Sequence, residues 1–163
     1  MADNKKILVL GVGNLLYADE SIGLRIVERL EERYTFSDNV TLMDGGTLGT
    51  RLMGPIIESD LLLVVDAVLG HGKPGDMYRL TGDDLRKSVS FKNSMHQTDL
   101  EDTLIYCGLV GNRPDAVVIG VEPEDYTSMS TELTPALAGR MDEFVAAVLK
   151  EVEAAGGEYV PKS

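Results

Sequence analysis

The chain has 163 residues and a net charge of −12, with 44% apolar and 26% charged residues. That length predicts one packed domain over residues 1–163, and the composition is typical of a soluble globular protein. The excess of acidic residues disfavours binding to nucleic acid or to an anionic membrane, because phosphates would repel the protein. The single cysteine, Cys107, excludes an internal disulfide and a metal site built from several cysteines.

The first residues do not resemble a signal peptide, because the apolar run 7–10 is short and is followed by glycines. No apolar stretch approaches the roughly 18 residues needed to cross a bilayer. We therefore expect a cytosolic protein.

Short apolar runs alternate with amphipathic stretches, a pattern typical of a sheet covered by helices. The run 61–65 has no polar alternation, which predicts a central strand buried on both faces. The segment 76–80 predicts an edge strand, and 116–121 the last strand of the chain. Further strands are expected at 6–10 and 40–43. The fold class is therefore α/β, a single domain with a twisted, mostly parallel five-stranded sheet and helices on both faces.

Helices are expected between these strands, at 50–58 and 98–109, with a single helical turn near Asp83. The first helix opens at 19–21, where acidic residues suit the positive end of the helix dipole. The last helix is expected to run from Thr134, as N-cap, to about residue 155, with Pro135 at its first position.

The glycine turn 11–14, between a strand and a helix, invites comparison with the dinucleotide-binding fingerprint. That fingerprint requires G-x-G-x-x-G, in which the third glycine lets the helix pack closely on the strand. Leu16 occupies the third position, and Asp19 and Glu20 at the helix start would repel a pyrophosphate. The sequence therefore disfavours nucleotide binding.

Two carboxylates and one histidine form a candidate metal site. Glu20 lies beyond the first strand, Asp66 directly follows the central strand, and His96 lies in a polar loop before a helix. The carboxyl ends of parallel strands meet at one edge of a sheet, so Glu20 and Asp66 are expected there, and His96 joins them if its loop folds over. Such a set suits a divalent ion with positions left open for substrate or water. Alternatively, Glu20 is an ordinary first-turn acid and His96 an ordinary loop residue, whereas Asp66 is costly to bury without a partner.

Asp44 follows the second strand and is followed in turn by Gly45 and Gly46, which allow a close approach of backbone to a ligand. It is a candidate general acid or base, or else the cap of its own turn. Cys107 lies in an apolar helical pattern, which favours a core role over that of a nucleophile.

Several stretches, in order along the chain, resemble the NiFe-hydrogenase maturation endopeptidases. They cover nearly the whole chain and are weakest over 70–95. The resemblance rests on ILVLGVGNLLYADESIGLRIVERL near the start, DGGT at 44–47, VVDAV at 64–68, His96 before a helix and GVEP at 120–123. The pattern GxGNxLxxDExxG is met by Gly11, Gly13, Asn14, Leu16, Asp19, Glu20 and Gly23.

The resemblance implies a twisted sheet flanked by helices and an endopeptidase that cuts the C-terminal extension from a hydrogenase large-subunit precursor. The cut follows nickel insertion and falls just beyond the cysteine motif that ligates the metal. The family's nickel contacts correspond to Glu20, Asp66 and His96, with the nickel supplied by the precursor. A non-cleaving nickel-sensing chaperone and a nucleotide-binding regulator are the alternatives.

Two chemistries remain open for the cleavage. Either a nickel-bound water attacks the scissile carbonyl, or a carboxylate activates water as general base. The candidate catalytic residues are Asp44, Asp66 and Glu20. Gly45, Gly46 and Thr47 are expected to bind substrate, with the amides of the two glycines as donors to the carbonyl oxygen. The absence of H-E-x-x-H separates the chain from ordinary zinc proteases.

Overall fold

The computed structural model describes residues 5–45, 53–88 and 100–163. Within these ranges the secondary structure alternates between strands and helices, and no helix is both long and apolar enough to cross a membrane. The elements are β1 Ile7–Gly11, η1 Ala18–Ser21, α1 Ile22–Arg33, β2 Tyr34–Phe36, β3 Val40–Asp44, α2 Met53–Glu58, β4 Leu61–Ala67, β5 Met77–Leu80, η3 Gly82–Lys87, α4 Leu100–Val110, β6 Asp115–Val121, α5 Pro135–Ala138, α6 Met141–Ala154 and β7 Tyr159–Pro161.

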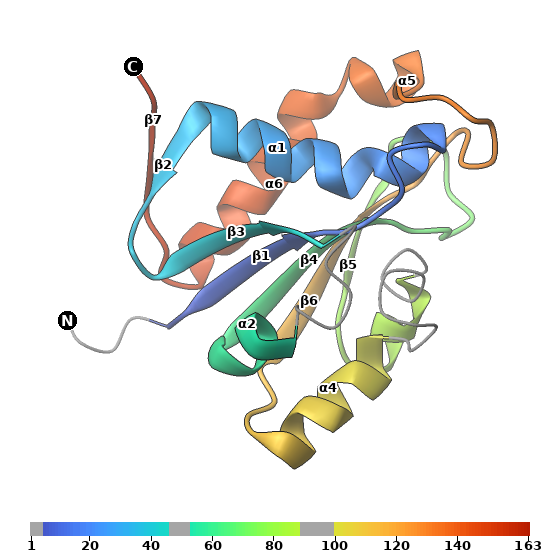
Figure 1. Cartoon of the computed structure of the whole chain (residues 1–163). Helices are drawn as coiled ribbons and strands as arrows, with labels where there is room; N and C mark the ends of the chain where they lie inside the picture. Colours follow the sequence, from blue (N-terminus) through green and yellow to red (C-terminus); the bar gives the residue numbers. More distant parts are fainter. Residues whose placement is uncertain (1–4, 46–52, 89–99) are drawn as a thin grey trace.

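The main sheet has five strands in the order β3-β1-β4-β6-β5 (Figure 1). The pairs β1–β3, β1–β4 and β4–β6 are parallel, and β5 pairs with β6 antiparallel. β4 is central and nearly fully buried, as its unbroken apolar sequence predicts. β5 lies at an edge, as expected. The predicted fold class, mostly parallel with five strands, is confirmed.

Helices cover both faces of the sheet, with α1 and α6 on one side and α2 and α4 on the other (Figure 1). Alternate residues of each strand supply the two cores, because successive side chains in a strand point to opposite faces. In β1, Ile7 and Val9 pack with α1 and α6, whereas Leu8 and Leu10 pack with α2 and α4. Two apolar layers therefore hold the sheet in place.

The C-terminal region differs from the expectation in two ways. The single helix predicted from Thr134 to about residue 155 is two helices, α5 and α6, separated at Gly139 and Arg140. A glycine weakens a helix interior by about 1 kcal/mol, and Arg140 bonds Glu143 at the start of α6 instead of continuing α5. The strand at 116–121 is also not the last, because β7 pairs antiparallel with β2. These two strands of three residues are too short for a recognisable period.

Three glycines explain how the turn after β1 brings α1 against the sheet. An added Cβ at Gly11 would lie 2.6 Å from the Gly23 carbonyl oxygen, and one at Gly23 would lie 2.0 Å from that of Val65. Gly13 has φ +145°, and a Cβ there would lie 2.1 Å from the Glu20 carbonyl oxygen. The close helix–strand packing that a dinucleotide fingerprint assigns to its third glycine is thus made by Gly23.

Replacing Gly23 by Ala is expected to lower the free energy of unfolding by about 3 kcal/mol, because the added methyl group meets backbone that cannot rotate away. Gly54→Ala in α2 is the matched control, since nothing lies within 4 Å of its Cβ position. The control should be neutral or stabilising by about 0.5 kcal/mol. Urea unfolding of both variants measures the difference, and equal stabilities would contradict the packing role of Gly23.

Candidate functional site

The carboxyl ends of β3, β1 and β4 form one rim of the sheet. Gly11 at the end of β1 pairs with Asp44 on one side and with Val65 on the other, and Asp66 is the next residue of β4. η1, which contains Glu20, follows β1 and packs against β4. The fold therefore brings Asp44 and Asp66 to the edge where the sequence predicts them, with η1 beside them.

Asp66 is fully buried, with 0% of its surface exposed. Its Oδ1 accepts a hydrogen bond from the Ala67 amide at 2.7 Å, and its Oδ2 accepts one from the Ser88 hydroxyl at 2.6 Å. These two bonds, one to each carboxylate oxygen, orient the group. The carboxylate is thus held in a fixed direction at the end of the central strand.

Ser88 is a positioning residue that the sequence does not reveal. It is fully buried, and an isolated antiparallel bridge to Val68 holds it beside the end of β4. Leu85 of η3, anchored in the core beneath α4, keeps the segment against the sheet. The apolar periodicity of the sequence does not indicate this contact, because Ser88 and Asp66 are 22 residues apart in the chain.

Glu20 and Asp44 differ from Asp66 in their exposure. Glu20 is partly buried in η1 and Asp44 is exposed at the end of β3. Both side chains are thus at least partly accessible to solvent, whereas Asp66 is buried.

His96, Gly46 and Thr47 lie outside the described residues. Among residues 5–45, 53–88 and 100–163, no group of three or more His, Cys, Asp or Glu side chains is arranged to hold a metal ion. The predicted set of Glu20, Asp66 and His96 includes one residue beyond these ranges and stays a prediction.

The Gly45 amide, expected to donate to a substrate carbonyl, is hydrogen-bonded within the sheet. That N–H donates to the Gly11 carbonyl at 2.8 Å, continuing the β1–β3 ladder by one residue. An amide that is already bonded within the sheet cannot serve as an oxyanion donor without breaking that bond. The absence of a side chain at Gly45 lets the chain pack against β1, because a Cβ there would lie 2.8 Å from the Leu10 side chain.

Asp19 lies in the first turn of η1, as expected, and in addition has a structural role. Its carboxylate is fully buried. It accepts hydrogen bonds from the Glu124 and Asp125 amides at 2.9 and 3.1 Å and from the Thr134 amide and hydroxyl, both at 2.8 Å. Thr134 therefore bonds Asp19 and does not cap α5 with its side chain, whereas Pro135 opens α5 as predicted. Asp19 thus joins η1 to the segment that leads into α5.

A family profile described as HycI, hydrogenase maturation protease, matches residues 24–151. The chain is 37% identical to the hydrogenase 2 maturation protease of Escherichia coli K12 over 159 residues, which cover 96% of each protein.

The chain belongs to the hydrogenase maturation protease family. Membership makes it a peptidase, as the resemblance predicted.

Other relatives and solved structures agree with this assignment. The HupD hydrogenase expression/formation protein of Rhodobacter capsulatus is 37% identical over 156 residues, covering 94% of this chain and 74% of HupD. The structure of the E. coli endopeptidase HybD superposes with a TM-score of 0.84 at 37% identity, covering 96% of this chain and 98% of HybD. The fold also matches HycI of Thermococcus kodakarensis, with a TM-score of 0.72 at 23% identity.

Glu122 shapes the loop that follows β4 in this maturation protease. Its Oε1 accepts hydrogen bonds from the Gly70 and Gly72 amides at 2.9 and 3.0 Å and from the Tyr78 hydroxyl at 2.6 Å. The bond to Glu122 raises the pKa of Tyr78 to about 12, so the phenol remains a donor at neutral pH. The GVEP stretch therefore contributes a buried carboxylate that organises the loop after β4.

Cys107 lies in the core of the protease, as expected. It is fully buried in α4, and burial raises the pKa of its thiol, which disfavours the nucleophilic thiolate. Cys107→Ala is therefore expected to leave kcat/KM for cleavage unchanged and to lower the free energy of unfolding by about 1 kcal/mol. Steady-state cleavage and urea unfolding measure the two quantities. Loss of activity in a folded variant would restore the thiol as a nucleophile.

Proposed function

We propose that this protease removes the C-terminal extension of a NiFe-hydrogenase large-subunit precursor after nickel has been inserted. The observation that carries the proposal is the placement of two carboxylates at the rim. Asp66, buried and oriented by Ser88, lies at the end of β4, and Asp44 lies at the end of β3, on the other side of β1. Family membership supplies the reaction class, and the carboxylates of the rim supply the groups that hydrolysis of a peptide bond requires.

We infer that nickel enters the site as part of the substrate, on the thiolates of the precursor. The chain has one cysteine, and it is buried in α4 away from the rim, so any thiolates on nickel come from the partner. Glu20, Asp66 and His96 would add two carboxylates and an imidazole, donors that suit a divalent transition metal with open positions. Docking on the metal would fix the peptide in register before cleavage.

Two routes to the attacking water remain in this proposal. In the first, a water on the nickel attacks the carbonyl of the scissile bond. In the second, a carboxylate takes the proton from a water, and Asp44 suits that role better than Asp66 because it is exposed. Asp66, bonded by Ser88 and Ala67, suits orientation and ligation.

Intact-mass spectrometry of the precursor tests the proposal directly. A nickel-loaded large-subunit precursor is incubated with the protease beside a nickel-free preparation of the same precursor. The expected result is loss of one C-terminal peptide in the loaded sample alone. Association without any change of mass would instead support the non-cleaving chaperone.

The His96→Ala variant provides a second arm, with His71→Ala as the matched control because His71 is exposed in another loop. His96→Ala should slow cleavage of the nickel-loaded precursor, whereas His71→Ala should cleave it at the wild-type rate. Equal rates in the two variants would remove His96 from the proposed nickel contacts.

A further inference from the structure

β3 forms one edge of the main sheet and ends at the candidate site. It pairs with β1 on one side, and within the described residues no strand pairs with its other side. Its last residue is Asp44, at the rim. A chain added to this edge would therefore lead directly to the carboxylates.

The hydrogen bonds of β3 define which backbone groups point outward. Ile7 donates to the Asn39 carbonyl and Gly45 donates to the Gly11 carbonyl, so the odd-numbered residues of this strand bond β1. In a parallel ladder the alternate residues point away from the partner. The N–H and C=O of Leu42 consequently point to the outer edge, where they can pair with an added strand.

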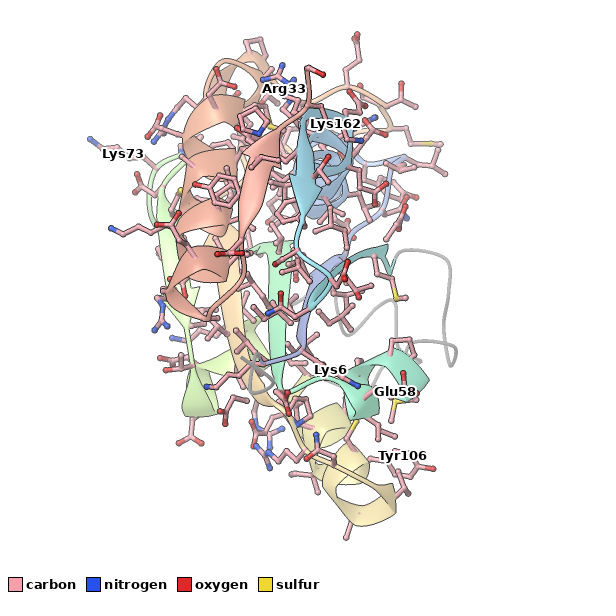
Figure 2. The ribbon with its side chains drawn as sticks, turned by 90° about the vertical axis from the view of Figure 1, so that its left-hand side faces the viewer. Lys6, Arg33, Glu58, Lys73, Tyr106 and Lys162 are labelled. Atoms are coloured by element: carbon pink, nitrogen blue, oxygen red, sulfur yellow. The ribbon has the colours of Figure 1, made fainter. Side chains whose placement is uncertain are left out.

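A groove of about 550 Å³ lies beside this edge, on the face that carries α2. Thr41 and Met43 of β3 line it, together with Lys6, Pro55 and Glu58. Figure 2 shows Lys6 and Glu58 next to each other. Alternate side chains of an added strand would enter this groove, because side chains alternate between the faces of a sheet.

We propose that the precursor segment next to the cleaved bond binds along β3 as an additional strand and delivers that bond to the rim. The inference rests on the proposed function. An endopeptidase must hold an extended backbone at its site, and five residues of β3 offer about 16 Å of backbone that ends at Asp44. A second copy of the chain is a poorer occupant, because each copy carries a net charge of −12 and the two would repel.

A backbone N-methyl scan of the substrate tests the proposal. The nickel-loaded precursor is prepared by semisynthesis with one N-methyl group at each of five successive residues adjoining the cleaved bond. Each methyl group removes one donor and blocks pairing only where the N–H faces β3. We expect kcat/KM to fall about tenfold at alternate positions and to stay near the unmodified value at those between them. Absence of this two-residue period would overturn the proposal.

Variants of the protease provide the second arm. Thr41→Trp fills the groove, and Thr35→Trp is the matched control, since Thr35 is also exposed but lies in β2 of the smaller sheet. Thr41→Trp should raise KM about tenfold with kcat unchanged, whereas the control should leave both constants unchanged. Equal KM and kcat values for the two variants would contradict binding of the substrate in the groove.

The two proposals fail in different ways. If the unmodified nickel-loaded precursor is not cleaved, the proposed function fails. If it is cleaved without the two-residue period, the function stands and the β3 inference fails. The last experiment is sedimentation of the protease alone. If the protease is a dimer and Thr41→Trp dissociates it, the β3 edge binds a second copy of the chain and the inference is overturned.

Discussion

Glu20→Gln is expected to lower kcat/KM for precursor cleavage about 100-fold or more while the protein remains folded. The substitution keeps the shape of the side chain and removes the charge that a nickel contact or a developing positive charge requires. Loss of one directly interacting group in a metal or transition-state site typically costs this much. Cleavage of the nickel-loaded precursor, followed by intact mass at several precursor concentrations, measures the effect.

Glu32→Gln is the matched control for that experiment, because Glu32 lies on the exposed face of α1, away from the rim. It should retain the wild-type kcat/KM. The free energy of unfolding should change by less than about 0.5 kcal/mol in this control, as for most surface substitutions. If Glu20→Gln cleaves as fast as Glu32→Gln, Glu20 is a helix-start acid without a role in the reaction.

Asp19→Ala is expected to lower the free energy of unfolding by about 3 to 5 kcal/mol. Four donors converge on the buried Asp19 carboxylate, from Glu124, Asp125 and Thr134. Alanine would leave them without that acceptor in a partly buried region, and each unsatisfied group costs about 1 kcal/mol or more. Urea unfolding monitored by circular dichroism measures the loss.

Asp142→Ala is the control for this second prediction, since the Asp142 side chain is 86% exposed and makes only surface ion pairs. Such pairs contribute about 0 to 1 kcal/mol. Asp19→Asn should fall between the two, because the amide keeps one acceptor oxygen. If Asp19→Ala unfolds at the same urea concentration as Asp142→Ala, the hydrogen bonds of Asp19 do not join η1 to the segment before α5.

Much of the fold follows from local patterns in the sequence. The unbroken apolar run 61–65 identifies the central strand, and the spacing of apolar residues in 19–33 identifies α1, because burial of one or both faces dictates the period of the pattern. The apolar surroundings of Cys107 indicate its burial for the same reason. The motifs around the strand ends, taken together, were sufficient to predict the family.

The positions at the carboxyl ends of strands were also predictable. Asp44 and Asp66 directly follow apolar runs, and parallel strands bring their carboxyl ends to one edge regardless of the loops between them. Their individual environments were not predictable. Asp66 is buried and oriented by Ser88, 22 residues away, whereas Asp44 is exposed, and local patterns do not reveal the Ser88 partner.

The sequence by itself determined the class of fold, the central strand, the apolar faces and the family, because each of these depends on residue types repeated over short distances. Only the tertiary structure decided the role of Asp19, the support of Asp66 by Ser88 and the use of the Gly45 amide within the sheet. It also decided the pairing of β2 with β7. In each case the partner lies 22 to 127 residues away, and which distant groups meet depends on how the whole chain packs.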